Sequence, residues 1–145
     1  MIIIAGDKEG FATISIIEDY LDSHHLEYQN MGVKNDSSDM KLEDMIPPVV
    51  KKVLEDEKNT AILSCGTGVG VEVGTNKFSG IRACLAVNEQ FAKWARVYDN
   101  CNVLCLSGWE MEKEKIIRIL QAWFSSVYDG DTVRRTMFSI FNTWH

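Results

Sequence analysis

The stretch Thr60-Ala61-Ile62-Leu63-Ser64-Cys65-Gly66-Thr67-Gly68-Val69-Gly70 decides the fold of this 145-residue chain. Its first half is an apolar run with the length of a buried strand, and its second half is a glycine-rich turn that leads into another apolar segment. A strand that passes directly through glycines into a helix is typical of parallel α/β folds. The stretch therefore predicts a parallel sheet with a ligand-binding loop at Cys65.

On both sides of this stretch, short apolar runs alternate with segments of helical periodicity. We expect strands at 1–5, 26–31, 60–64, 81–87 and 103–106, and helices at 11–21, 45–54, 88–98, after 107 and from about 131. No repeat or linker divides the chain. This alternation predicts a single domain, residues 1–145, folded as a three-layer α/β/α sandwich with a Rossmann-like parallel sheet.

Several boundaries follow from local signals. Pro47 and Pro48 are tolerable only in the first turn of a helix, so we expect the second helix to begin near them. Ser107 with Glu110 fits a capping box that opens a helix. The C-terminal helix, at about 131–145, carries enough apolar side chains to pack against a partner subunit, although packing on its own domain is the alternative.

Composition excludes several classes of function. The formal net charge is -6, and no run of Lys or Arg is long enough to grip nucleic acid or an anionic membrane. The apolar start, residues 1–5, is too short for a signal peptide, and no segment approaches the roughly 20 apolar residues of a membrane span. We therefore expect a cytoplasmic protein with reduced cysteines and neither nucleic-acid nor membrane partners.

Metal chemistry is not expected. The histidines are His24, His25 and His145, and none is near a cysteine in the sequence. Without a cluster of ligand residues, the sequence predicts no metal site and no cofactor.

Two glycine-bearing turns follow predicted strands, Gly6-Asp7-Lys8-Glu9-Gly10 and the Cys65 loop. Both should open at the carboxyl edge of the sheet and face one pocket. Glycines allow the backbone of the Cys65 loop to point N–H groups inward at a helix start, where anions are favoured. The positive electrostatic field at the start of the helix also favours a thiolate, so Cys65 is a candidate base. Thr67 adds a movable hydroxyl.

Other interpretations of the Cys65 loop are weaker. A phosphatase loop would need arginine at the position of Val71, and a Walker loop would need a Gly-Lys-Ser/Thr ending. The alternative that needs no chemistry is that Cys65 is a small buried residue. We expect that simpler role for Cys84, Cys101 and Cys105, which lie in or next to predicted strands.

Motifs spread over nearly the whole chain occur together in one known family. In chain order they are Gly6-Asp7, Gly10-Phe11, Cys65-Gly66-Thr67-Gly68-Val69-Gly70, Asn76-Lys77, Gly80-Ile81-Arg82-Ala83, Asn102-Val103-Leu104, Tyr128-Asp129-Gly130 and Arg134-Arg135. In this combination the chain resembles the family of ribose-5-phosphate isomerase B and the galactose-6-phosphate isomerase subunits. The resemblance implies five parallel strands, a homodimer or homotetramer, an active site shared by two subunits, and aldose-ketose isomerisation of a phosphorylated sugar without metal.

The resemblance also implies roles for individual residues. Cys65 would move a proton between C1 and C2 through a cis-enediolate, whose oxygen the amides of Gly66, Gly68, Val69 and Gly70 would stabilise. Thr67 would assist ring opening. The implied substrate-binding residues are Asp7, Lys8, Tyr98 and Asn102, and the implied phosphate-binding residues are Lys8, Arg134 and Arg135, with Arg135 supplied by the neighbouring subunit.

The chain departs from the family pattern at several of these positions. Lys8 stands where the family usually has histidine, and lysine can still bind phosphate as a point charge. Tyr98 occupies the place of the ring-opening histidine, and a phenol is a poor base at neutral pH. The other departures are Leu42 for a tyrosine, Val87-Asn88 for a His-Asp pair, and Asp131 for a phosphate-binding arginine.

Two further hypotheses stay open beside the isomerase. One is a heteromeric isomerase, in which a paralogous subunit supplies the missing histidine. The other is a non-catalytic sugar-phosphate-binding protein that keeps the fold and the glycine loop. A nucleotide-binding flavodoxin-like domain is weaker, because neither glycine turn matches a dinucleotide or P-loop pattern.

Overall fold

The central sheet is built from apolar runs that are buried on both faces. The computed structural model describes residues 1–144, and its strands are β1 (Ile2–Gly6), β2 (Tyr28–Asn30), β3 (Thr60–Cys65), β4 (Ala83–Leu85) and β5 (Val103–Ser107). All four pairings are parallel, and the strand order is β2-β1-β3-β5-β4. The predicted five-stranded parallel sheet is confirmed.

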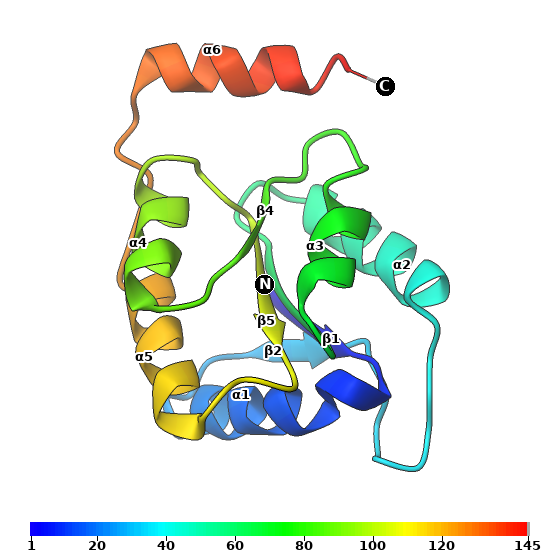
Figure 1. Cartoon of the computed structure of the whole chain (residues 1–145). Helices are drawn as coiled ribbons and strands as arrows, with labels where there is room; N and C mark the ends of the chain where they lie inside the picture. The colour runs from blue at the N-terminus through cyan, green and yellow to red at the C-terminus, as the bar shows by residue number, and fades with distance from the viewer. Residues whose placement is uncertain (145) are drawn as a thin grey trace.

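Helices cover both faces of this sheet (Figure 1). The helices are α1 (Phe11–Ser23), α2 (Leu42–Leu54), α3 (Val69–Thr75), α4 (Glu89–Val97), α5 (Lys113–Phe124) and α6 (Thr132–Phe141), with a short 3-10 helix η1 (Lys8–Gly10). Side chains alternate along each strand, so that Ile62 packs with α1, α4 and α5 while Leu63 packs with α2 and α3. The three-layer α/β/α sandwich is therefore confirmed.

The second helix begins earlier than the sequence predicts. It starts at Leu42, which puts Pro47 and Pro48 in its sixth and seventh positions rather than in its first turn. Neither proline has an N–H, so the carbonyls of Glu43 and Asp44 lose their helical donors. Both prolines lie on the exposed side of α2, where water can satisfy those carbonyls. The expected position of the prolines was wrong, because α2 begins a full turn before Pro47 and leaves both prolines on its exposed side.

The capping box at Ser107 and Glu110 was also wrong. Helix α5 begins at Lys113, and its N-cap is Glu112. The Ser107 hydroxyl does accept a hydrogen bond from the Glu110 backbone N–H at 3.3 Å, but it also donates to the carbonyl oxygen of Gly66 at 2.8 Å. Ser107 therefore joins two loops instead of starting a helix.

Helix α6 lies apart from the other helices, beyond one end of the sheet (Figure 1). Asp131 caps α6 by accepting a hydrogen bond from the Arg134 N–H at 2.8 Å, as expected for a helix beginning near 131. The helix ends at Phe141. Residue 145, part of the predicted helix, lies outside the described residues. A cavity of about 670 Å³ separates α6 from α3 and α4, and Phe91, Trp94 and Phe141 are among its lining residues.

No helix within residues 1–144 is both long and apolar enough to cross a membrane.

Replacing Leu104 by alanine tests the core. Leu104 is fully buried in the middle of β5, and we expect Leu104→Ala to cost about 2 to 5 kcal/mol in the free energy of unfolding, because the cavity left behind cannot collapse fully. The control is Val127→Ala, whose side chain is exposed and whose effect should stay within about 0.5 kcal/mol. Equal midpoints of urea unfolding for the two variants would contradict this account of the core.

Candidate active site

Three strand ends meet at one edge of the sheet. Gly6 of β1 pairs with Ser64, and Cys65 of β3 pairs with Ser107 of β5. The loops that follow these strands must therefore start side by side. The Gly108 N–H donates to the carbonyl oxygens of Cys65 at 2.8 Å and Gly66 at 3.0 Å, which ties the loop after β5 to the loop after β3.

Cys65 is the last residue of β3 and is 5% exposed. Its face of the sheet is the one that α2 and α3 cover. A β-carbon added to Gly70 would lie 3.6 Å from Cys65 Sγ and 3.0 Å from Cδ1 of Leu42. The thiol therefore lies against the first turn of α3, with Leu42 of α2 close by as an apolar wall.

The glycine loop turns into α3 as the sequence predicts. Gly68 is the N-cap of α3 and has a φ of 78°, a left-handed conformation that only glycine adopts without strain. Thr67 is exposed, and its Oγ1 accepts a hydrogen bond from the Val69 N–H at 3.1 Å. The Thr67 hydroxyl proton therefore remains available to a ligand.

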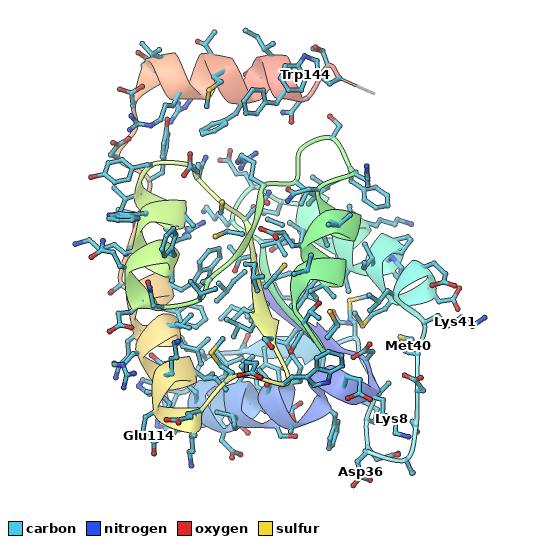
Figure 2. The ribbon with its side chains drawn as sticks, in the orientation of Figure 1. Lys8, Asp36, Met40, Lys41, Glu114 and Trp144 are labelled. Carbon is cyan, nitrogen blue, oxygen red and sulfur yellow. The ribbon has the colours of Figure 1, made fainter. Side chains whose placement is uncertain are left out.

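Asp7 lies in the neighbouring loop after β1. Its side chain caps η1 by accepting a hydrogen bond from the Gly10 N–H at 3.0 Å. Burial raises the pKa of the Asp7 carboxyl above its ordinary value, and the carboxylates of Asp39 and Glu9 add to the increase. Lys8 is exposed, and its backbone N–H donates to Asp39 Oδ1 at 3.3 Å. Lys8 and the loop around Asp36 lie close together at the far side of the molecule from Trp144 (Figure 2).

The other three cysteines are placed as structural residues. Burial raises the pKa of the Cys84 thiol to about 11 and that of Cys101 to about 12, and it raises the pKa of the fully buried Cys105 well above its ordinary value. These thiols stay protonated at neutral pH and are poor bases. The prediction that they are core or wall residues is confirmed by their positions in β4, before β5 and in β5.

Four of the predicted site residues lie at the opposite edge of the sheet, where the strands begin: Tyr98, Asn102, Arg134 and Arg135. Asn102 directly precedes β5, whose other end carries Ser107 beside Cys65, so a strand length of roughly 16 Å separates them. The Asn102 side chain accepts from the Arg82 N–H at 2.9 Å and donates to the Gly80 carbonyl at 2.9 Å. Tyr98, at the C-terminal end of α4, and the start of α6 are near this edge.

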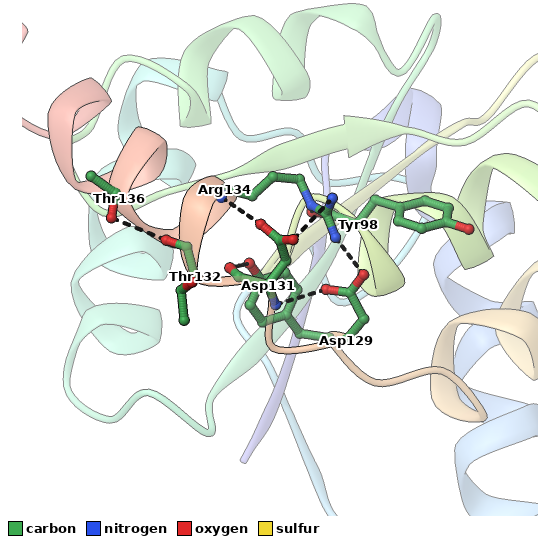
Figure 3. A network of polar contacts seen from close by, with 7 residues as sticks. Tyr98, Asp129, Asp131, Thr132, Arg134 and Thr136 are labelled. Atoms are coloured by element: carbon green, nitrogen blue, oxygen red, sulfur yellow. Dashed lines mark hydrogen bonds and ion pairs between the residues drawn. The ribbon is translucent and has the colours of Figure 1, made fainter.

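Arg134 is held in a network of polar contacts (Figure 3). Its guanidinium pairs with Asp129 and, at 3.9 Å, with Asp131, while its Nε donates to the Tyr98 carbonyl at 2.8 Å. A backbone hydrogen bond from Asp131 and the bond from Arg134 lower the pKa of the Asp129 carboxyl. Arg135 is exposed, and its guanidinium carbon lies 5.7 Å from the centre of the Tyr128 ring.

Glu9 and Trp109 were not among the predicted site residues, although both lie at the sheet edge that carries Cys65. The Trp109 indole N–H donates to Glu9 Oε2 at 2.8 Å, which joins the loops after β5 and β1. The available signal was the position of Trp109 three residues after the predicted strand end at 106. Within residues 1–144, no group of three or more His, Cys, Asp or Glu side chains could hold a metal ion.

Comparison with known proteins gives consistent matches. A family model described as ribose/galactose isomerase matches residues 2–140. A Mycoplasma genitalium protein named "Probable ribose-5-phosphate isomerase B" is 33% identical over 140 residues, which is 96% of this chain and 92% of that protein.

Solved structures match over nearly the whole chain. A ribose 5-phosphate isomerase from Thermotoga maritima has a TM-score of 0.92 and 28% identity, covering 99% of this chain and 97% of that one. Ribose-5-phosphate isomerase B from Mycoplasma genitalium, solved with bound ribulose-5-phosphate, has a TM-score of 0.87 and 32% identity, covering 97% and 93%.

The raised pKa of Asp7 predicts a pH dependence of stability. The folded state binds this proton more tightly than the unfolded chain, where the carboxyl has its ordinary pKa of 3.8, so ionised Asp7 opposes folding. The stability that protonated Asp7 gives the folded state is therefore lost as pH rises from 3.8 through the pKa of the folded state. Asp7→Asn removes the titration, and its amide oxygen can still accept the Gly10 N–H. We expect the urea midpoint of Asp7→Asn, relative to wild type, to increase between about pH 3 and pH 7. A difference that does not change with pH would contradict the burial of this carboxylate.

Proposed function

Because the chain belongs to the ribose/galactose isomerase family, we propose that it interconverts the aldose and ketose forms of a phosphorylated sugar with Cys65 as the proton-transferring base. The family match over residues 2–140 makes it an aldose-ketose isomerase of the sugar-phosphate class. The observation that supports the proposed mechanism is the thiol at the end of β3, directly before a glycine loop that opens a helix.

The proposed reaction moves one proton between two carbons. The Cys65 thiolate takes the proton from C2 of the open-chain aldose, which leaves a cis-enediolate with its charge on O1. The hydroxyl proton on O2 passes to O1, and the Cys65 thiol then returns its proton to C1 as the C2 carbonyl forms, which gives the ketose. Backbone N–H groups of the loop Gly66 to Gly70 stabilise the charge on the enediolate oxygen, and such preorganised donors are a large term in catalysis. The Thr67 hydroxyl assists ring opening, and Asp7 binds sugar hydroxyls.

The substrate we propose is a pentose 5-phosphate, with a hexose 6-phosphate as the alternative. The related Mycoplasma genitalium enzyme was solved with ribulose-5-phosphate. Lys8 lies in the loop after β1, beside the Cys65 loop, and its exposed ammonium suits a phosphate group. Leu42 near Gly70 narrows the site on its other side with an apolar surface.

We also propose that two copies of the chain share each active site. Tyr98, Asn102 and Arg135 lie at the sheet edge opposite to Cys65, so they cannot reach Cys65 of their own chain. Arg135 is exposed and has no carboxylate partner among residues 1–144, so it is the better of the two arginines for a phosphate on another copy. Exposed apolar side chains on α6, among them Ile140 and Phe141, suit contact with that copy.

Two observations favour the alternatives. Arg134 is already paired with two carboxylates, and Tyr98 replaces a histidine that the resembling family uses for ring opening. A paralogous subunit that carries this histidine, or a role in binding sugar phosphates without turnover, would fit these changes. Turnover by the purified chain alone eliminates both alternatives.

The first test is isomerisation of a panel of aldose and ketose 5- and 6-phosphates. We expect Cys65→Ala to lower kcat by about 10² to 10⁴-fold, the usual contribution of a positioned general base. The matched control is Cys84→Ala, because the thiol of Cys84, with its pKa raised to about 11, is not expected to act as a base. Undiminished turnover by Cys65→Ala would refute the proposed mechanism. Binding without turnover by the wild type would favour the binding role or a missing subunit.

The shared site predicts complementation between two inactive variants. In a dimer, random pairing of Cys65→Ala with Arg135→Ala chains makes half of the dimers mixed, and each mixed dimer has one intact site of two. We therefore expect co-purified chains to recover about a quarter of wild-type activity. Each variant alone serves as the control. A mixture that contains both chains in one oligomer but remains inactive would show that Arg135 acts within its own chain.

A further inference from the structure

Trp109 is a large aromatic residue at the sheet edge that carries Cys65. It lies in the loop after β5, two residues beyond Ser107, and 62% of it is exposed. An exposed tryptophan is normally mobile unless other groups hold it. This one is held at several points.

Three hydrogen bonds fix the position of Trp109. Its backbone N–H donates to the carbonyl oxygen of Gly66 and to Ser107 Oγ, both at 3.1 Å. Its indole Nε1–H donates to Glu9 Oε2 at 2.8 Å. The side chain therefore spans from the loop after β5 to the loop after β1, and its orientation is set before any ligand arrives.

The indole ring lies directly on Gly66, the residue after Cys65. A β-carbon on Gly66 would be 2.4 Å from both Cε2 and Cζ2 of Trp109, so any side chain at position 66 would collide with the ring. The ring thus covers the backbone next to the thiol and leaves the rest of its surface exposed. A rigid aromatic surface next to a few polar groups is the usual construction of a small-molecule site.

We propose that Trp109 is a specificity-determining residue, whose indole is the surface on which the C–H face of the sugar packs while C1 and C2 lie at Cys65. This inference rests on the proposed function. Sugars have apolar C–H faces that bury against aromatic rings, and an indole already fixed in place loses little conformational entropy on binding. The ring does not touch the migrating proton. Its contribution therefore belongs to substrate binding, which appears in KM, and not to the chemical step.

The test compares Trp109→Ala and Trp109→Phe with the wild type on the same panel of sugar phosphates. We expect Trp109→Ala to raise KM by about 10-fold or more, as for loss of an apolar contact in a specificity pocket. The difference in kcat/KM between preferred and poor sugars should become smaller. The kcat value should stay within about threefold, because ground-state and transition-state binding weaken together. Trp109→Phe keeps an aromatic ring, so its KM should lie between those of the wild type and Trp109→Ala. Inorganic phosphate is the control ligand. Its affinity, measured by calorimetry, should be the same for the wild type and the two Trp109 variants.

Glu9 provides a matched pair of variants for the positioning of the ring. Glu9→Gln keeps a side-chain carbonyl that accepts the indole N–H, whereas Glu9→Ala does not, and both remove the same charge. We expect Glu9→Ala to raise KM and Glu9→Gln to stay close to wild type. Equal KM values for Glu9→Ala and Glu9→Gln would show that the hydrogen bond to Glu9 does not position the ring for the sugar.

Binding measured without turnover separates this inference from the proposed function. Sugar phosphate should quench tryptophan fluorescence in the wild type, and Trp109→Phe should lose most of that quenching. Unchanged KM and unchanged sugar preference in Trp109→Ala, with Cys65-dependent turnover intact, would overturn the role of Trp109 and leave the isomerase standing. If the wild type binds sugar phosphate without turnover and Trp109→Ala binds it more weakly, the role of Trp109 in binding would be supported, and the chain would not be an isomerase on its own. Neither binding nor turnover by the wild type would overturn both.

Discussion

The parallel pairing of β3 with β1 on one side and β5 on the other is the constraint on which the rest of the structure depends. Parallel strands in register end at the same edge, so Gly6, Cys65 and Ser107 come together although they are far apart in the sequence. Both faces of these strands are buried, and a slip of one residue would turn the apolar side chains to the wrong layer. Register and burial together fix the relative positions of these three strand ends.

The position of a cysteine on this sheet decides what it can do. Cys105 lies in the middle of β5 on the same face as Cys65, yet burial raises the pKa of its thiol strongly and keeps it protonated. Cys65 ends its strand directly before a loop of glycines, beside backbone N–H groups at the start of α3. The two residues are identical in type and share one layer of the fold. They differ in their position along a strand, because Cys105 lies within β5 and Cys65 ends β3.

The same sheet that brings Gly6, Cys65 and Ser107 together keeps Tyr98, Asn102 and Arg135 at the other end of its strands. A residue before a strand and a residue after it lie a full strand length apart, as Asn102 and Ser107 do at the two ends of β5. The proposed contributions of Tyr98 and Arg135 therefore depend on a second chain, with α6 extending from the body as the element that carries Arg135 (Figure 1). The network of Arg134 with Asp129 and Asp131 braces the start of that helix (Figure 3).

The sequence by itself determined the parallel α/β sandwich, the glycine loop at Cys65 and the placement of the other cysteines, because these follow from local periodicity and from residues that are neighbours in the chain. It misjudged Pro47 and Ser107, because a helix start and a capping pattern depend on competing partners: solvent replaces the donors that Pro47 and Pro48 lack, and Gly66 takes the Ser107 hydroxyl. The tertiary structure alone decided that Trp109 lies on Gly66 and binds Glu9, and that Tyr98 and Arg135 are far from Cys65. These relations join residues that are distant in the chain, and only the register of the sheet sets the distances between them.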